Sequence, residues 1–595
     1  MQAHRIQIFL FILMIISGVY GFHYHAWKDY SVANSLYSTL RLFVIDIDNV
    51  FTKEGDNFVA YPLEVEIARW SAALYLISTV FQIAYLFFYR TMKLFFYKLI
   101  GNHYVIVGYQ EQSKILIKDL CEKGEHVILL TEGEGLSSTE KEFLNELGVV
   151  VLVGPKTEHD LYDKAGLNRA GYCILFDVDD SSNLDELISI KEYFLHRPRL
   201  GKPLNILLHL SKYQSMILYE EIEKEVSKLE EILVRIMNTN RLIADQLLNE
   251  HPLYLHYEDR VKDPVGEPLH LLFVGFDGTN QQVALKAMER AHFFTLSPLT
   301  ITVLDREIEK AEKSWFRSYP KSRHVARFKF VAFDIDTESL ESFIDDTDRS
   351  YTHVFISTGD DYLNIMEGIR LSKWLKNLPV FISVKDEGLL SYQVYQKNRE
   401  QANLYCFGNY DKVLTKEYFV NEKEDRLAKL IHERYRKQKR RESPLATLPP
   451  SWEQLTDFMR ESNRSQFNHA RTKLMLLGLE AVPESVVNKE KTRILTKEEY
   501  LLKIQDHLEL LAEIEHRRWC AFHYLRGWDV YPNPTAEKTK DEEMKLHGCL
   551  VSWQELDRVM EQVGENYKNY DRNSIIGLYD MWKELDYEIV VREEG

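Results

Sequence analysis

The chain has 595 residues, which is too long for a single hydrophobic core and favours three or four domains. Its 45% hydrophobic and 28% charged residues are ordinary for globular protein, so most of the chain should fold in water. A formal net charge of −17 argues against a nucleic-acid backbone as the main partner. The five cysteines show no disulfide-like spacing, which favours a reducing compartment.

Two apolar segments near the start predict a membrane hairpin within residues 1–100. Residues 6–22 have about the minimum length for crossing a bilayer, and residues 70–89 have the usual length. Arg5 precedes the first segment as in a secretory signal, but no small-residue cleavage site follows, and the second segment favours an uncleaved hairpin. Basic residues follow the second segment and acidic ones fill the loop. The positive-inside bias therefore predicts a multi-pass protein of the cell inner membrane with both termini and the soluble domains in the cytoplasm.

The loop between the two segments has the order expected of a pore. Residues 31–48 predict an amphipathic helix, then an apolar run that ends in carboxylates. The order span, short helix, acidic loop, span is that of a two-span cation-channel subunit, but no TVGYG-type filter is present and potassium selectivity is not supported. Asp46 and Asp48 are candidates for an ion path in an oligomer; the alternative is that they are solvated loop acids.

After the second span, short apolar runs alternate with helical patterns in two successive units, residues 101–250 and 251–444. This alternation predicts two Rossmann-like, doubly wound parallel sheets of the α/β class, joined by a helical connector at residues 215–248. The expected strands are 105–108, 126–130, 149–154, 172–176 and 205–210 in the first unit, and 270–275, 301–305, 328–334, 353–357 and 380–384 in the second.

Each unit opens with a strand, a glycine turn and a helix, the arrangement of a dinucleotide site. Such a site needs G-x-G-x-x-G for the pyrophosphate and an acid for the ribose. Gln110 would crowd a pyrophosphate and Asp277 would repel it, so intact NAD binding is not favoured. Adenosine without its phosphates, another nucleotide and a purely structural role stay open. The candidate cofactor-binding residues are Gly108, Gln110, Ser113, Glu132, Gly275, Asp277, Gly278 and Asp305.

An ordered series of segments in residues 104–183 resembles the TrkA-N domain, the regulator of potassium conductance (RCK). The series is VIVGYQEQS, HVILLTEGEG, ELGVVVLVGPKTEHDLYDKAGLNRAGYCILF and DVDDSSN. The second unit is similar more loosely, through LLFVGFDGTN and ITVLD. The resemblance implies a cytoplasmic ring, a homotetramer by analogy, that moves a pore when a nucleotide or an ion binds.

From about residue 445 long helical patterns replace the strands, at 452–480 and 510–528, and predict an all-α module over residues 445–595. The order EIEHRRW, GW, HGCLVSWQEL, DRNSI resembles the RyR domain, the helical repeat of ryanodine receptors that also occurs in bacterial proteins. The resemblance covers about residues 452–585 and implies a module that senses a ligand or a partner.

Charged groups beside flat aromatics in this module could stack on and bind a nucleobase or a similar ring. The alternative is that the tryptophans are core and the charges are helix-surface pairs. His516, Cys520 and His523 also recur at metal-ligand spacing on one helix, but no metal site is predicted. The candidate pocket residues are Asn463, Arg464, Glu515, Arg518, Trp519 and Trp528.

The basic run RYRKQKRR (434–441) stands against the acidic trend of the chain. It is interpreted either as a solvated helix end or linker, or as a contact for phosphate or lipid. No Ser-His-Asp arrangement, P-loop or paired carboxylate site is recognisable, so no catalytic residue and no enzymatic activity are predicted.

These features predict a ligand-gated, cation-channel-like membrane protein whose RCK-like ring and RyR domain sense a small molecule, with a nucleotide preferred. The alternative is a membrane-anchored nucleotide-messenger signalling or defence effector without selective conduction. A third hypothesis, an anchored redox enzyme, requires tight NAD binding. The expected partners are the lipid membrane, the nucleotide and further copies of the chain, and no nucleic acid.

Overall fold

The computed structural model divides the chain into two compact units, residues 1–100 and residues 101–595, which are described separately. It describes residues 2–592 apart from 28, 45, 48–49, 53–59, 133–135, 198, 200, 258–267, 296, 347–350, 387, 389–391, 394, 397–402, 422–424, 443–447 and 489–491.

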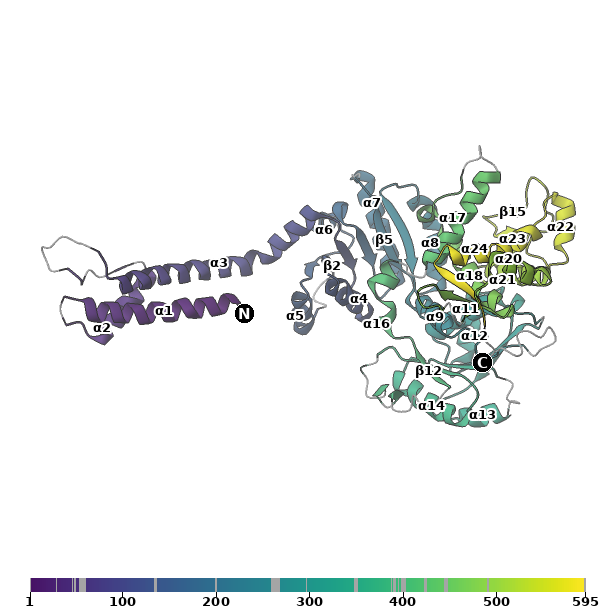
Figure 1. The fold of residues 1–595 in the computed structure, drawn as a ribbon, viewed down its shortest axis with the longest axis horizontal. Coiled ribbons are helices and arrows are strands. Elements are labelled where there is room, and N and C mark those ends of the chain that lie inside the picture. Colours follow the sequence, from purple (N-terminus) through teal and green to yellow (C-terminus); the bar gives the residue numbers. More distant parts are fainter. Residues whose placement is uncertain are drawn as a thin grey trace. The chain divides into compact units, whose positions relative to one another are not determined.

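The first unit is a helical hairpin with a short helix in its loop (Figure 1). Helix α1 (Gln2–His25) packs against α3 (Leu63–Ile100), and each contains a stretch long and apolar enough to cross a bilayer, by length and composition. Between them, α2 (Val32–Arg41) and the 3₁₀ turn η1 (Leu42–Val44) confirm the predicted amphipathic helix and apolar run. The α2 helix begins at Ser31, whose hydroxyl accepts the Asn34 N–H at 3.1 Å.

The second unit begins with a six-stranded, all-parallel sheet of order β3-β2-β1-β4-β5-β6. Its central strands are continuous apolar runs, buried on both faces as in other helix-covered parallel sheets. The strands are β1 (Tyr104–Val107), β2 (Val127–Thr131), β3 (Val150–Val153), β4 (Tyr172–Leu175), β5 (Leu204–His209) and β6 (Ile232–Met237). The flanking helices are α4 (Glu111–Glu122), α5 (Ser138–Glu146), α6 (His159–Ala165), α7 (Asp180–His196), α8 (Tyr213–Val226) and α9 (Thr239–Glu250), with the turn η2 (Leu167–Arg169).

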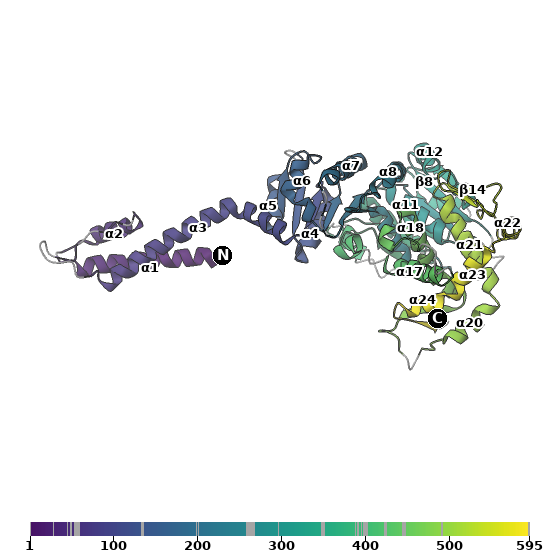
Figure 2. The ribbon, with the colours of Figure 1, turned by 90° about the horizontal axis from the view of Figure 1, so that it is seen from above.

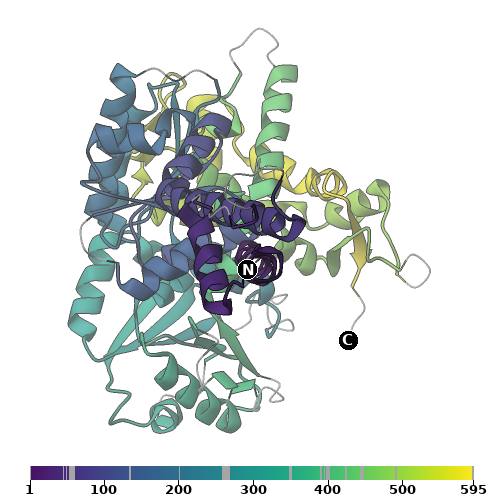
Figure 3. The same cartoon turned by 90° about the vertical axis from the view of Figure 1, so that its left-hand side faces the viewer.

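A second parallel sheet follows, of order β12-β11-β10-β7-β8-β9, which is the same winding repeated. Together the two sheets confirm a pair of doubly wound Rossmann-like domains. The strands are β7 (His270–Val274), β8 (Leu299–Asp305), β9 (Ala326–Ala332), β10 (His353–Ile356), β11 (Val380–Ser383) and β12 (Leu404–Phe407). The helices are α11 (Gly278–Arg290), α12 (Ile308–Ser318), α13 (Leu340–Asp346), α14 (Asp361–Trp374), which packs on β11, and α16 (Tyr410–Val413), with the turns η3 (Ser322–His324) and η4 (Lys416–Val420). Figure 3 shows helices and strands of this domain in teal.

Two strands depart from the sequence prediction. The predicted helical connector at residues 215–248 is wrong, because it contains the edge strand β6 between α8 and α9. Arg235 interrupts the apolar run of β6, and the strand is defined by its parallel pairing with β5. Edge strand β12, which pairs with β11, was also not expected.

The remaining residues form a mainly helical module. The prediction of an all-α module is wrong, because β13 (Leu479–Pro483) and β17 (Tyr587–Val591) pair in antiparallel, and the short strands β14 (Asp529–Val530), β15 (Lys540–Asp541) and β16 (Leu546–His547) form a small sheet. The helices are α17 (Asp425–Glu442), α18 (Asp457–Asn468), α19 (Ala470–Leu476), α20 (Lys497–Gln505), α21 (Leu508–Tyr524), α22 (Leu556–Val563), α23 (Lys568–Ile576) and α24 (Leu578–Lys583), with the turn η5 (Trp452–Gln454).

Packing ties this module to both sheets. Figure 2 shows α17, α18, α21 and α23 close together, and α18 contacts both α17 and α21. Helix α9 of the first sheet packs against α11 of the second, and α11 contacts α18 and α21. One hydrophobic cluster therefore extends from Tyr104 through both sheets to Ile589.

Candidate ligand-binding cavity

The glycine turn of the first α/β domain is closed by its own side chains. Gly108 has φ +94°, and a Cβ there would lie 2.7 Å from the Asp177 Cα, so only glycine fits. Gln110 starts α4: its N–H donates to the Ser113 hydroxyl at 2.8 Å, and its Nε2 donates to the carbonyls of Phe176 and Asp177, both at 3.3 Å. The Gln110 side chain thus lies across the carboxyl end of β4.

The neighbouring strand ends carry an internal ion pair. Glu132 Oε1 accepts the Lys156 N–H at 3.3 Å, and the Lys156 ammonium pairs with Asp177 and, at 3.6 Å, with Glu186. Burial raises the pKa of Glu186 to about 8, against the opposing effect of Lys156. The polar side chains at this edge of the sheet therefore form hydrogen bonds and ion pairs with one another.

In the second domain a carboxylate takes the place that a phosphate would occupy. Gly275 has φ +73°, and a Cβ there would lie 2.3 Å from the Ser357 carbonyl oxygen. Asp277 caps α11: its Oδ1 accepts the N–H groups of Thr279 and Asn280 at 3.1 and 3.0 Å, and its Oδ2 accepts the Ser357 hydroxyl at 3.0 Å. Helix N-terminal N–H groups are the usual donors to a bound phosphate, so this start of α11 is already satisfied.

The other predicted residues of this turn are likewise engaged. Asp305 accepts the Phe276 N–H at 2.9 Å and the Glu307 N–H at 2.8 Å, which fixes its carboxylate at the end of β8. At Gly278 a Cβ would lie 2.8 Å from the Asn240 amide nitrogen. The two turns therefore position backbone, and their polar side chains are committed to internal hydrogen bonds.

A cavity of about 940 Å³ lies in the C-terminal module. This volume is that of a small-molecule or cofactor site. Helices α17, α18, α21 and α23 and the segments around residues 539–549 and 565–567 surround it. Three of the residues predicted for a pocket, Glu515, Arg518 and Trp519, line it.

One wall of the cavity is basic and comes from α17. Arg434, Lys437 and Arg441 line the cavity at positions i, i+3 and i+7, a spacing that places side chains along one helical stripe. Arg434 is held by the Gly577 carbonyl at 2.8 Å and by Glu584 at 3.3 Å. We call these three residues the basic stripe.

A second part of the cavity lining combines aromatic rings with carboxylates. Tyr567 and Tyr570 stack with ring centroids 6.3 Å apart, and the Tyr570 hydroxyl donates to Glu565 at 2.7 Å. Asp571 lies 3.6 Å from His516 Nδ1 and is itself part of the lining. Trp519 completes this wall, which we call the aromatic wall.

The floor of the cavity is a buried ion pair on α21. Arg518 donates to both carboxylate oxygens of Glu515, at 3.1 and 2.9 Å, and to the Ser465 hydroxyl at 2.9 Å. Burial would raise the pKa of Glu515, but Arg518 and Lys473 outweigh it and lower the pKa to about 2. The carboxylate is therefore charged at neutral pH and keeps the guanidinium in place.

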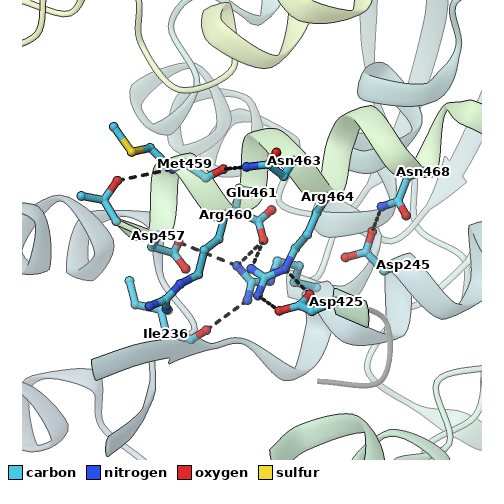
Figure 4. Close-up of polar contacts among 12 residues, drawn as sticks. Ile236, Asp245, Asp425, Asp457, Met459, Arg460, Glu461, Asn463, Arg464 and Asn468 are labelled. Atoms are coloured by element: carbon cyan, nitrogen blue, oxygen red, sulfur yellow. Dashed lines mark hydrogen bonds and ion pairs between the residues drawn. The ribbon is translucent and has the colours of Figure 1, made fainter. Parts of the chain in front are cut away.

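The other residues predicted for this pocket lie elsewhere. Asn463 donates to the Met459 carbonyl of its own helix at 2.8 Å. Trp528 is buried and stacks on Phe458, with ring centroids 5.4 Å apart, as core tryptophans do. Arg464 does not line the cavity and pairs with Asp425 (Figure 4).

Arg464 belongs to a buried ionic network centred on Glu461. This carboxylate, 3% exposed, lies 3.0 Å from Arg241, 3.0 Å from Lys286, 2.7 Å from Arg464 and 3.5 Å from Arg526 (Figure 4 shows the α18 side). Burial would raise the pKa of Glu461, but the surrounding cations lower it well below its ordinary value. The network joins α18 to α9 of the first sheet and α11 of the second.

The same helix also reaches the cavity. Ser462 and Gln466 of α18 line it, and the Gln466 amide donates to the Ser574 hydroxyl of α23 at 2.9 Å. Helix α18 therefore has one face in the cavity and another in the ionic network.

The residues at metal-ligand spacing make other contacts. His516 Nε2 lies 2.8 Å from the Val551 carbonyl oxygen, and His523 Nδ1 lies 2.8 Å from that of Trp519. Cys520 Sγ lies 3.4 Å from His516 Nε2. Within the described ranges, no group of three or more His, Cys, Asp and Glu side chains could hold a metal ion.

Of the two ion-path candidates, Asp46 pairs with Arg41 of α2 and keeps 56% of its side chain exposed. Asp48 lies outside the described residues.

Sequence reasoning missed most of the cavity lining. The basic run at 434–441 carried the signal for the basic stripe, since a phosphate contact was one of its two interpretations. Apart from Trp519, the aromatic wall lies in and beside the NYDRNSI segment, where Tyr570 and Asp571 are adjacent in sequence.

Comparisons with known proteins give fold-level neighbours only. No protein-family model matches the chain, and no curated protein matches it. Solved structures similar to this chain include GsuK bound to ADP (12% identity, TM-score 0.37, covering 70% of this chain and 97% of that one) and the GsuK channel bound to NAD (11%, 0.38, 72% and 86%). The human SLO3 gating ring is also similar (9%, 0.37, 54% and 83%). Because these TM-scores are low, the fold assignment rests on the two sheets themselves.

Proposed function

We propose that this chain is a ligand-gated, cation-channel-like membrane protein of the cell inner membrane. Its C-terminal module, which resembles the RyR domain in sequence, binds a small molecule in the cavity. Its tandem RCK-like α/β domains form a cytoplasmic ring in a homotetramer and carry the response toward the helical hairpin. The proposal assigns no catalytic reaction to the chain.

The observation that carries this proposal is the position of α18 between the cavity and the ionic network. Ser462 and Gln466 face the cavity, while Glu461 contacts cations of α9 and α11. A ligand that favours one position of α18 would therefore act on both α/β domains at once. It needs a difference in binding free energy of a few kcal/mol between the two arrangements to shift the populations substantially.

The membrane part of the proposal rests on the two apolar helices and their acidic loop. Helices α1 and α3 have the length to cross a bilayer, and Asp46 follows α2 in the loop between them. In an oligomer, Asp46 and Asp48 of each copy would line the ion path.

A second candidate function is a membrane-anchored effector that responds to a nucleotide messenger without selective conduction. The ion pair between Asp46 and Arg41 favours it, since a carboxylate with a cationic partner attracts a passing cation less. The absence of a glycine-rich filter from the sequence favours it as well.

The test is a current measurement on the full chain in planar bilayers, with a protein-free small-molecule extract of bacterial cells as the source of ligand. Wild type should conduct only with the extract, and Ser462→Trp, which places a bulky ring in the cavity lining, should abolish the response. Ser342→Trp, at an exposed serine of α13, is the matched control and should respond like wild type.

Substitution of both Asp46→Asn and Asp48→Asn should reduce the cation current. Current that ignores the double substitution would remove the ion-path assignment. Vesicle leakage without ion preference would favour the effector. A response that survives Ser462→Trp would place the sensor elsewhere.

A further inference from the structure

We propose that the cavity binds a nucleoside phosphate, with its phosphates along the basic stripe and its base against the aromatic wall. This rests on the proposed function in one respect, that the cavity is the ligand sensor.

Two of the three cations of the basic stripe are available to a ligand among the residues that the structure describes. In the described part of the chain, Lys437 and Arg441 have no ion-pair partner, whereas Arg434 is shared with Glu584. From Arg434 to Arg441 a helix rises by about 10 Å, so the stripe can contact more than one phosphate. Guanidinium and ammonium groups are the standard partners of phosphate oxygens.

Cations near a helix C-terminus also stabilise the helix itself, and that role needs no cavity. Two adjacent residues separate the roles. Arg440 and Arg441 lie in the same last turn of α17, but Arg441 lines the cavity and Arg440 does not. The interaction energy with the helix dipole is similar for both side chains, whereas a ligand in the cavity contacts only Arg441.

The aromatic wall supplies what a base and a ribose need. Trp519 and Tyr567 present flat rings on which a base can stack. Glu565 and Asp571 are carboxylates beside those rings, and each can accept hydrogen bonds from an exocyclic amine or a ribose hydroxyl. A simple anion would leave this wall unused, and an apolar ligand would leave the basic stripe unpaired.

The glycine turns strengthen the assignment. Asp277 and Gln110 already use the hydrogen-bonding positions where a Rossmann-like domain holds a pyrophosphate. Lys437 and Arg441 of the basic stripe, in contrast, have no ion-pair partner among the described residues and can contact a phosphate.

The test is calorimetric titration of the detergent-solubilised full chain with AMP, ADP, ADP-ribose, cyclic di-AMP and their guanosine counterparts, with adenosine and inorganic pyrophosphate as half-ligands. At least one nucleotide should bind more tightly than either half-ligand. Lys437→Gln and Arg441→Gln should each weaken it by about ten-fold or more, and Arg440→Gln by less than about two-fold.

Trp519→Leu should weaken the same nucleotide by about ten-fold while leaving pyrophosphate binding unchanged. Tyr567, the other ring proposed to stack on the base, provides a second variant, Tyr567→Leu, if the first fails to fold. Equal losses for Arg440→Gln and Arg441→Gln would overturn the phosphate assignment. Binding of pyrophosphate as tight as that of the nucleotide would overturn the base assignment. If no nucleotide binds while the cell extract still opens the wild type, the ligand class is wrong and the proposed function stands.

Discussion

Replacing Glu461 by glutamine tests whether the ionic network stabilises the unit of residues 101–595. The substitution keeps the size of the side chain and removes one negative charge. Four cations then remain around a neutral amide, the nearest at 2.7 Å and the farthest at 3.5 Å, in a site where Glu461 is 3% exposed. These cations lose their common partner while staying buried.

Removing one member of a buried ion pair costs about 3–5 kcal/mol, because the partner charge stays desolvated. A unit of about 500 residues has an unfolding entropy of about 1 kcal/mol per degree near its midpoint. We therefore expect Glu461→Gln to lower the melting temperature of this unit by about 3–5 °C.

The assay is thermal unfolding of the full chain in detergent micelles, followed by tryptophan fluorescence. The control is Glu433→Gln on α17, where the carboxylate is 42% exposed and pairs with Arg436 at 2.8 Å within one helix. Such a surface pair is worth less than about 1 kcal/mol, so the control should melt within about 1 °C of wild type. If Glu461→Gln melts no lower than Glu433→Gln, the network does not stabilise the unit.

Three further predictions use the same melting assay. Asp277→Ala removes the cap of α11 and should cost about 1–2 kcal/mol, whereas an unchanged midpoint would mean that another group replaces the cap. Gly108→Ala forces a Cβ into the Asp177 backbone at φ +94° and should cost at least about 1–3 kcal/mol; equal stability would contradict the tight turn. Burial lowers the pKa of His523 to about 3 and that of His547 to about 4, below the unfolded value of about 6.5. Below about pH 6.5 the unfolded state binds a proton at each of these histidines before the folded state does. The free energy of unfolding therefore falls as the pH drops, by about 2 kcal/mol per histidine at about pH 5 relative to its value above about pH 6.5. His547→Gln should therefore flatten the decline of the midpoint between about pH 7 and 5, and identical pH profiles would refute this.

The central strands and the two altered glycine turns could be predicted from the sequence, because both depend on neighbouring residues. The central strands are continuous apolar runs, and the departures at Gln110 and Asp277 from a dinucleotide turn are visible as single letters; the structure shows both side chains in internal hydrogen bonds. Edge strand β6 was missed because Arg235 breaks its apolar run and only pairing with β5 defines it.

The cavity could not be predicted in full because it joins distant segments. Arg434 donates to the carbonyl of Gly577, 143 residues away, and residues of both segments line the cavity. Nothing in the run 434–441 itself distinguishes Arg441, which faces the cavity, from its neighbour Arg440. Sequence pattern alone does not show whether Trp528 stacks on a ligand or packs in the hydrophobic core; in the structure it is buried in the core.

Helix α3 has a further mechanical consequence. It runs for 38 residues from Leu63 to Ile100 without a glycine or a proline. At this length it extends for about 57 Å, nearly twice the hydrocarbon thickness of a bilayer. A helix without a kink or a bulge keeps a regular rotation of about 100° per residue along its whole length. The two ends of α3 therefore keep a fixed angular relation, so one extra residue in its last turns would rotate the side chains at its C-terminal end, such as Lys98, by about 100° relative to its apolar half, with almost no change in length.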